Sequence, residues 1–345
     1  MPLRRHFVSI AALLVASTAS AQVSLTPKTE SKPAAAKSER SKAAPKAKSS
    51  SSATQTKSAF PNPPVDNPNA DLAYGAFQQG SYITALKLAT QRAGEKNDPK
   101  SMTLIGEIYA NGFGVKQDDA KAAEWYKRAA DMGDREAMFG LAMLKIAGRG
   151  VPQQREEAAK LLAASAKLGK AAAAYNLGLL YLEGQVFPQD LKRAAELFKQ
   201  AADAGNPEAQ YALATFYKEG RGVEKNLTEA ARLLRAAAMV DNLDAEVEYA
   251  IALFNGTGTP RDVPTALAVL NRAARQGSPI AQNRLARVLV FGQGTAVNKI
   301  EGFRWHLTAK TAGASDPELD ALYQQQTPDD RKKSEDLAKK WFGTK

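Results

Sequence analysis

Small and apolar residues recur along this chain with a period of 36 residues, and this pattern predicts its architecture. The clearest marker is a glycine column in which neighbouring members are 36 positions apart: Gly112, Gly148, Gly184, Gly220, Gly256 and Gly292. A second column, two residues later, holds glycine in every unit except the third, where Val186 stands. A sequence that repeats at such a period folds as a stack of similar units, each of which contacts its neighbours.

Each unit has room for two helices separated by two turns. In the third unit, Ala173, Leu177, Gly178 and Tyr181 are spaced as one buried helical stripe. We expect the first glycine column to end this helix, because glycine adopts the left-handed conformation at little cost. The second helix should start after residues that mostly favour the N-cap position: Asp118, Gln154, Asp190, Asn226, Asp262 and Asn298. Its inner face should carry an alanine column followed by larger residues, namely Trp125, Leu161, Leu197, Leu233, Val269 and Trp305.

The segments Ala173-x-x-x-Leu177-Gly178-x-x-Tyr181-x-x-Gly184 and Gly220-x-Gly222-Val223 resemble the Sel-one-like repeat, a relative of the tetratricopeptide repeat. The resemblance covers residues 98–313 as six repeats. It implies an all-α fold, a right-handed superhelical solenoid of antiparallel helix pairs with 36-residue repeats. Residues 69–97 resemble a tetratricopeptide-like helical hairpin, and residues 314–345 are expected to form capping helices that start near Pro317 and Pro328.

The N-terminus has the pattern of a secretory signal peptide. Arg4 and Arg5 precede a short apolar run from Phe7 to Ala16, and Ala19-Ser20-Ala21 fits a cleavage site. We therefore expect residues 1–21 to be removed after Ala21 and the protein to be periplasmic or secreted. An uncleaved anchor is the alternative, although the run is short for a membrane span. The paired arginines also weakly resemble a twin-arginine signal.

Residues 22–68 differ from the rest of the chain because lysine, serine, alanine and proline dominate and large apolar residues are scarce. Within residues 22–58, eight basic residues face two acidic ones, so this tail carries a net charge of +6. Such a composition predicts a disordered linker. The 22–58 tail could contact anionic lipid or wall polymer, with a soluble spacer as the alternative. Nucleic acid is not an expected partner of an exported protein.

The composition speaks against most catalytic sites. There is no cysteine, and His6 and His306 are the only histidines, so thiolate and most histidine-dependent chemistry is excluded. We expect His306 to be packed or solvated and not to act as a pH-sensitive contact. The glycine-rich loops lack the Gly-Lys-Ser/Thr ending of a phosphate-binding loop and follow helices, so we do not expect them to bind a phosphate group. Together with the missing cysteines and the scarce histidines, this leads us to expect no cofactor and no metal.

A resemblance to tetratricopeptide arrays implies that first-helix positions outside the buried stripe line a concave face. There the central units are apolar and aromatic, with charged residues such as Glu107, Arg284 and Arg287 at the flanks. The candidate partner-binding residues are Phe139, Met143, Tyr175, Leu179, Tyr211, Thr215, Ile251 and Phe254. The alternative is that a tight superhelix buries these side chains against neighbouring helices.

These observations predict a non-catalytic protein–protein interaction scaffold or regulatory adaptor of the bacterial cell envelope. Its expected partner is a segment of another protein, such as a membrane sensor or an envelope complex. The competing hypothesis is a peptidoglycan-associated accessory protein or a wall-acting enzyme, because a superhelix can bring distant carboxylates together.

Overall fold

The computed structural model of the chain describes residues 71–343, so the expected signal peptide and linker lie outside the described residues. The described part folds into sixteen α-helices and contains no strand. The helices are α1 (Leu72–Gln78), α2 (Tyr82–Lys96), α3 (Pro99–Asn111), α4 (Asp119–Asp131), α5 (Arg135–Ala147), α6 (Arg155–Lys167), α7 (Ala171–Glu183), α8 (Leu191–Asp203), α9 (Pro207–Glu219), α10 (Leu227–Ala238), α11 (Leu243–Asn255), α12 (Val263–Arg275), α13 (Pro279–Phe291), α14 (Lys299–Thr311), α15 (Pro317–Gln324) and α16 (Pro328–Gly343).

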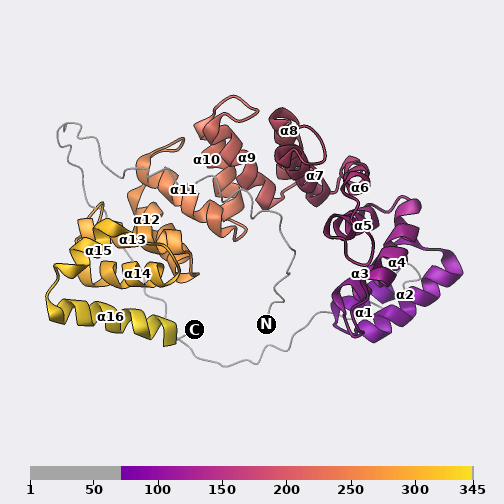
Figure 1. The fold of residues 1–345 in the computed structure, drawn as a ribbon, viewed down its shortest axis with the longest axis horizontal. Helices are drawn as coiled ribbons and strands as arrows, with labels where there is room; N and C mark the ends of the chain where they lie inside the picture. Colours follow the sequence, from indigo (N-terminus) through magenta and orange to yellow (C-terminus); the bar gives the residue numbers. More distant parts are fainter. Residues whose placement is uncertain (1–70, 344–345) are drawn as a thin grey trace, which may run out of the picture.

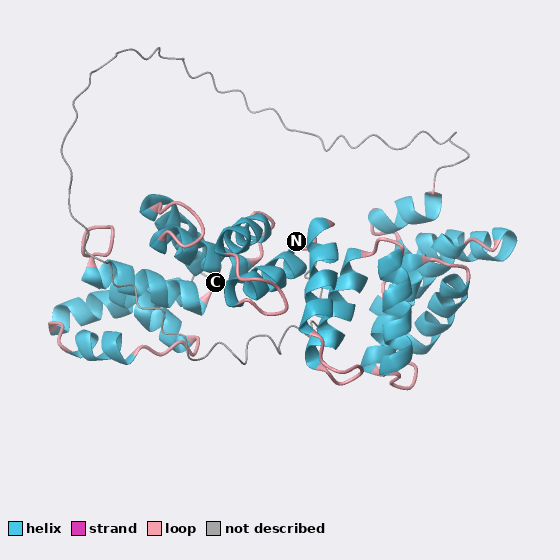
Figure 2. Cartoon of the chain, turned by 90° about the horizontal axis from the view of Figure 1, so that it is seen from above, coloured by secondary structure: helices cyan, strands magenta, loops and turns pink. Residues whose placement is uncertain are grey.

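The helices follow one another along an arch, from α1 at one end to α15 and α16 at the other (Figure 1). From α1 to α14, each helix packs mainly against the helices before and after it in the chain, as expected of a solenoid, and α16 packs against α14. The view from above shows the same succession of paired helices (Figure 2). The predicted all-α solenoid of helix pairs is therefore confirmed. Among the helices of residues 71–343, none has both the length and the apolar character that a membrane crossing requires.

The ends of the helices lie where the sequence places them. Every first helix from α3 to α13 ends at a glycine of the first column in the left-handed conformation, with φ between 66° and 75°. Asp118, Asp190 and their equivalents accept a hydrogen bond from the backbone of the second helix that each precedes. Gln154 is the exception and makes no such bond. Helix capping therefore fixes the boundaries of nearly every unit.

Within each unit, a small residue on the first helix faces a large one on the second. A Cβ atom added to Gly106 would come within 2.7 Å of the Tyr126 ring, and one added to Gly178 within 2.7 Å of Phe198. Tyr126 and Phe198 belong to a column of buried residues that also holds Leu162, Leu234, Leu270 and His306. The expected column, which begins at Trp125, lies one residue earlier and is less deeply buried in the first, second and fifth units.

Between units, the second glycine column brings two backbones together. A Cβ atom added to Gly222 would lie 2.3 Å from the carbonyl oxygen of Leu191, in the first turn of the preceding unit's second helix. Gly150 and Gly258 approach Asp119 and Leu227 in the same way. No Cβ atom fits at such distances, so these positions require glycine for space as well as for conformation. Val186 has no positive φ, which shows that the third loop follows another path.

The C-terminal cap is joined to the last repeat by charged and aromatic contacts. Asp316 caps α15 by accepting from the Leu319 amide at 3.2 Å, and it also accepts from Asn283 and Arg287, both at 2.9 Å. Burial opposes the charge on Asp316, but these three hydrogen bonds together lower its pKa. The Trp341 ring lies edge-on to Trp305, with centroids 5.4 Å apart.

His306, whose packed position was expected, is fully buried under the cap. Its Nε2 atom lies 2.9 Å from the Asp320 carboxylate, while Nδ1 has no hydrogen-bond partner. The histidine occupies the position held by aromatic or leucine side chains in the other units, so here the cap supplies a polar partner for an otherwise apolar site.

The close backbone contact at Gly222 can be tested by comparison with Gly205. Gly205 also has a positive φ, but no atom lies within 4 Å of a Cβ atom added there. We expect Gly205→Ala to destabilise the fold by about 1 kcal/mol, the strain of the left-handed conformation. Gly222→Ala should cost about 2–4 kcal/mol because the backbones must also separate. Urea unfolding followed by circular dichroism measures both midpoints, and equal shifts would contradict the close contact.

Asp316→Ala should destabilise the cap by about 2–4 kcal/mol, since it removes a helix cap and leaves Arg287 without one of its partners. Tryptophan fluorescence in a Trp125→Phe background reports on Trp305 and Trp341. Because folding lowers the pKa of Asp316, its contribution is complete above the ordinary carboxyl pKa and fades as the pH falls. The exposed Asp336→Ala is the control, and an equal effect of both variants at neutral pH would refute the role of Asp316.

Candidate partner-binding surface

The first helices of the repeats form the inner side of the arch. In Figure 1, α5, α7, α11 and α13 lie inside the curve relative to α6, α8 and α12. The first helices of the six repeats are α3, α5, α7, α9, α11 and α13. We use the term inner face for those of their side chains that are at least partly exposed. Because the second helices cover the opposite side, a segment of a partner held within the arch would contact the inner face.

Several candidate residues do reach the inner face. Phe139 and Met143 on α5, Tyr211 and Thr215 on α9, and Ile251 on α11 are all partly exposed. The ammonium group of Lys170 lies 5.4 Å from the centre of the Phe139 ring. The Phe139 side chain is still partly exposed to solvent. These five positions give the central units a surface of mixed apolar and aromatic character.

The remaining three candidates belong to the core. Tyr175, Leu179 and Phe254 are only 7%, 4% and 7% exposed. The Tyr175 ring packs against Phe198 with centroids 5.7 Å apart, and burial, aided by Glu208, raises its pKa to about 12. These three side chains therefore pack against neighbouring helices, which was the alternative that the sequence left open.

The inner face also carries acidic residues, which sequence reasoning missed. Burial, followed by the carboxylates of Glu248, Asp244 and Glu219, raises the pKa of Tyr211 to about 12. Glu248 accepts a hydrogen bond from Lys218 at 2.9 Å, whereas Asp244 has no ion-pair partner in the described chain. Partial desolvation followed by the charge of Glu248 raises the pKa of Asp244. The signal for this acidic surface is present in the sequence as carboxylates in the exposed first-helix positions.

The sign of the charge changes at the last repeat. Arg284 and Arg287 project from α13 on the same side of the array, and each is partly exposed. The charge of Arg287 lowers the pKa of Arg284 in addition to the larger effect of burial, while Glu248 and Asp316 act in the opposite direction. The inner face is therefore acidic along α9 and α11 and basic on α13.

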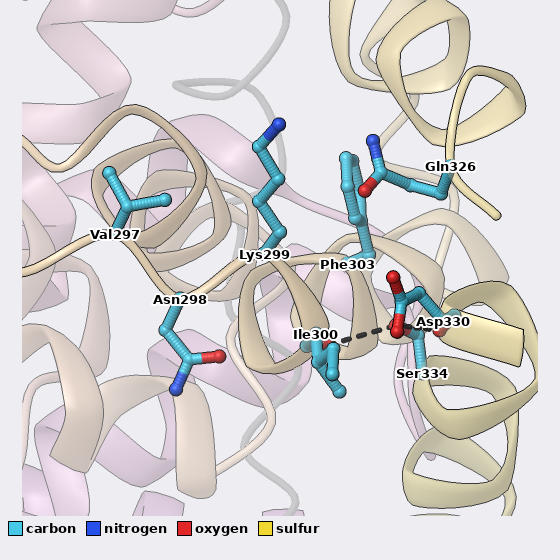
Figure 3. Close-up of a pocket in the computed structure, with 8 residues that line it drawn as sticks. All are labelled: Val297, Asn298, Lys299, Ile300, Phe303, Gln326, Asp330 and Ser334. Atoms are coloured by element: carbon cyan, nitrogen blue, oxygen red, sulfur yellow. Dashed lines mark hydrogen bonds between the residues drawn. The ribbon is translucent and has the colours of Figure 1, made fainter.

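A pocket of about 340 Å³ lies between the start of α14 and α16 (Figure 3). Its polar groups already serve the fold: Ser334 donates to the Ile300 carbonyl at 3.1 Å, and Asn298 accepts from the Glu301 amide. Hydrogen bonds from Thr327 and then Lys333 lower the pKa of Asp330. The pocket is a packing hollow beneath the cap. In the described residues, no group of three or more metal-ligating side chains is placed to hold a metal ion.

Comparison with known proteins places the repeats in a family. The family model of the Sel1 repeat matches six consecutive segments: residues 99–134, 135–170, 171–206, 207–242, 243–278 and 279–313. No curated protein matches the chain.

Solved structures of bacterial proteins share the architecture. A Sel1 repeat protein from Oxalobacter formigenes is 26% identical, with a TM-score of 0.60, and the match covers 72% of this chain and 100% of that one. A protective antigen of uropathogenic Escherichia coli strains, which displays an SLR fold, is 24% identical with a TM-score of 0.54. That match covers 76% of this chain and 64% of the antigen. With more than half of its residues inside six matched repeats, this chain belongs to the Sel1 repeat family.

Proposed function

We propose that this protein is a non-catalytic scaffold or regulatory adaptor of the bacterial cell envelope, which holds a segment of a partner protein on its inner face. Sel1 repeat proteins typically take part in protein–protein interactions, which supports the general class. The observation that carries the proposal is the partly exposed set of Met143, Tyr211 and Ile251, which lie on the first helices α5, α9 and α11. Side chains of this kind are enriched at the centre of protein interfaces.

The envelope location is a separate part of the proposal. It is supported by the sequence alone, through the arginines at positions 4 and 5, the short apolar run and the Ala19-Ser20-Ala21 site. The +6 tail that follows would then lie between the export signal and the array, where it can reach anionic surfaces. A membrane sensor or an envelope complex is the kind of partner that suits this location.

The double variant Met143→Ala, Ile251→Ala tests the inner face. Crosslinking of the full chain in its native envelope first identifies the partner, and a binding assay with the purified partner then gives the affinity. We expect the double variant to weaken binding by about tenfold or more, since the few residues whose truncation costs more than about 1 kcal/mol cluster at the centre of an interface.

The control for this experiment is Met239→Ala. Met239 is 75% exposed and follows the second helix α10, so its truncation removes a similar side chain away from the inner face. Unchanged affinity in the double variant, with a Met239→Ala variant that binds weakly, would reject the inner face as the binding surface. Release of sugar or peptide fragments from purified cell wall would instead support the wall-acting alternative.

Export predicts a defined mature N-terminus. N-terminal sequencing of the protein from the periplasmic fraction should start at Gln22, because signal peptidase requires small residues at positions 19 and 21. Ala21→Arg should leave the full-length precursor with the membrane fraction, whereas Ser20→Thr should be processed normally. A wild-type chain that keeps residues 1–21 would contradict cleavage.

A further inference from the structure

The sixth repeat presents a side-chain pattern that the other repeats do not have. Ile280, Arg284, Arg287 and Phe291 follow the spacing i, i+4, i+7 and i+11, so they form one stripe along α13. We call these four residues the α13 stripe. Its middle is two guanidinium groups, and a large apolar side chain stands at each end.

The apolar ends of the α13 stripe are exposed. Ile280 is 55% exposed and Phe291 is 36% exposed. Among the first helices of the six repeats, these are the only exposed large hydrophobic side chains. The guanidinium of Arg287 lies 5.3 Å from the centre of the Phe291 ring, so the charged and apolar parts of the stripe are continuous. Exposed apolar side chains next to arginine are typical of binding surfaces.

The two arginines differ in how their charge is balanced. Arg287 donates to Asp316 at 2.9 Å and to Glu318 at 2.6 Å, and these bonds outweigh burial and raise its pKa. No carboxylate within residues 71–343 lies within ion-pair distance of Arg284. Its guanidinium is partly buried and stands beside a second cation, both of which lower its pKa. A cation in this setting gains more from an added carboxylate than one in open water does.

The rest of the inner face restricts what can bind here. At the positions equivalent to the α13 stripe, the five preceding repeats together hold seven carboxylates and one lysine, Lys100. Four of the carboxylates are paired with a cation: Glu136 with Lys170, Glu183 with Arg155, Glu219 with Arg221 and Glu248 with Lys218. Within residues 71–343, Asp244 and Glu208 have no ion-pair partner. Asp244 and Glu248 on the neighbouring first helix α11 are two of these carboxylates. A uniformly acidic partner, or the flat surface of an anionic bilayer, would meet the unpaired carboxylate of Asp244 beside the arginines and be repelled by it. A peptide with one compact acidic site would not be repelled in this way.

We propose that the α13 stripe docks a peptide segment of the partner protein in which a carboxylate side chain lies between large apolar side chains. The carboxylate pairs with Arg284, and the apolar side chains cover Ile280 and Phe291. This inference rests on the proposed scaffold function and assigns the chemistry of one part of its binding surface. It also orients the partner, because any basic residues in the segment would lie toward Asp244 and Glu248 on α11.

The test uses the full chain and a short, end-capped synthetic peptide that carries leucine and glutamate on one helical face. Matched peptides replace glutamate with glutamine or with lysine. In fluorescence anisotropy at low salt, we expect the glutamate peptide to bind at least about tenfold more tightly than the glutamine peptide. Arg284→Ala should remove that difference, and Arg284→Lys should restore part of it because lysine keeps the charge but not the bidentate geometry.

Arg275→Ala is the matched control, since Arg275 is an exposed arginine at the end of the second helix α12. It should bind like the wild type. Thermal unfolding should show that Arg284→Ala is fully folded at the temperature of the binding assay, because Arg284 makes no ion pair whose loss would unfold the repeat. Equal binding of the three peptides, or wild-type affinity in Arg284→Ala, would overturn the inference. So would Arg284-dependent binding of phosphatidylglycerol vesicles without binding of the glutamate peptide.

Crosslinking in the native envelope separates this inference from the broader proposal. If the wild type captures no partner, the scaffold function fails. If the wild type and Arg284→Ala capture the same partner with equal yield, only the role of the α13 stripe fails. Loss of capture in Arg284→Ala, with capture retained in Arg275→Ala, would support both.

Discussion

The close contact between the loop glycines Gly150, Gly222 and Gly258 and the first turn of the preceding second helix determines how these repeats stack. At Gly150, Gly222 and Gly258, backbone meets backbone with no side chain between them. Such a contact has little freedom to slide or tilt, because no rotamer can adapt to a change. It therefore turns successive first helices toward the same side, and the existence of a common inner face follows from it. Val186 replaces the glycine in the third loop and has no positive φ, and next to it Gln185 accepts a hydrogen bond from Arg155 at 2.6 Å.

Local patterns in the sequence were sufficient to predict most of the fold. The left-handed glycines and the aspartate and asparagine caps act within a few residues of themselves, so their effect could be read directly from the chain. The depth at which each apolar residue is packed could not be predicted in this way. Trp125 and Tyr126 are adjacent apolar residues, as are Leu161 and Leu162, and periodicity alone does not decide which column lies deepest. The fit of Tyr126 and Phe198 against glycines of the first helix decides it.

The candidate site was harder to predict, because it depends on the rotation between neighbouring repeats. Tyr175 and Tyr211 occupy the same position in neighbouring repeats, yet Tyr175 is buried and Tyr211 is partly exposed. No pattern within one unit encodes that rotation. The acidic residues of the inner face were missed for another reason: Asp244 and Glu248 lie on another repeat than Glu219, and only the stacking of the repeats brings all three near Tyr211. The spacing of Arg284 and Arg287 on one helix face was visible in the sequence, but their different pairing required coordinates.

The backbone contact at the loop glycines also bears on how such a protein can evolve. A duplicated internal unit carries both halves of the contact, the glycine of its loop and the first turn of its second helix, so a copy inserted in register finds compatible neighbours on both sides. The array can thus lengthen by whole units without compensating substitutions. The cap is different, because its attachment depends on the particular pairing of Asp316 with Asn283 and Arg287. Duplication is therefore expected to spread through the interior of the gene and to leave its last repeat single.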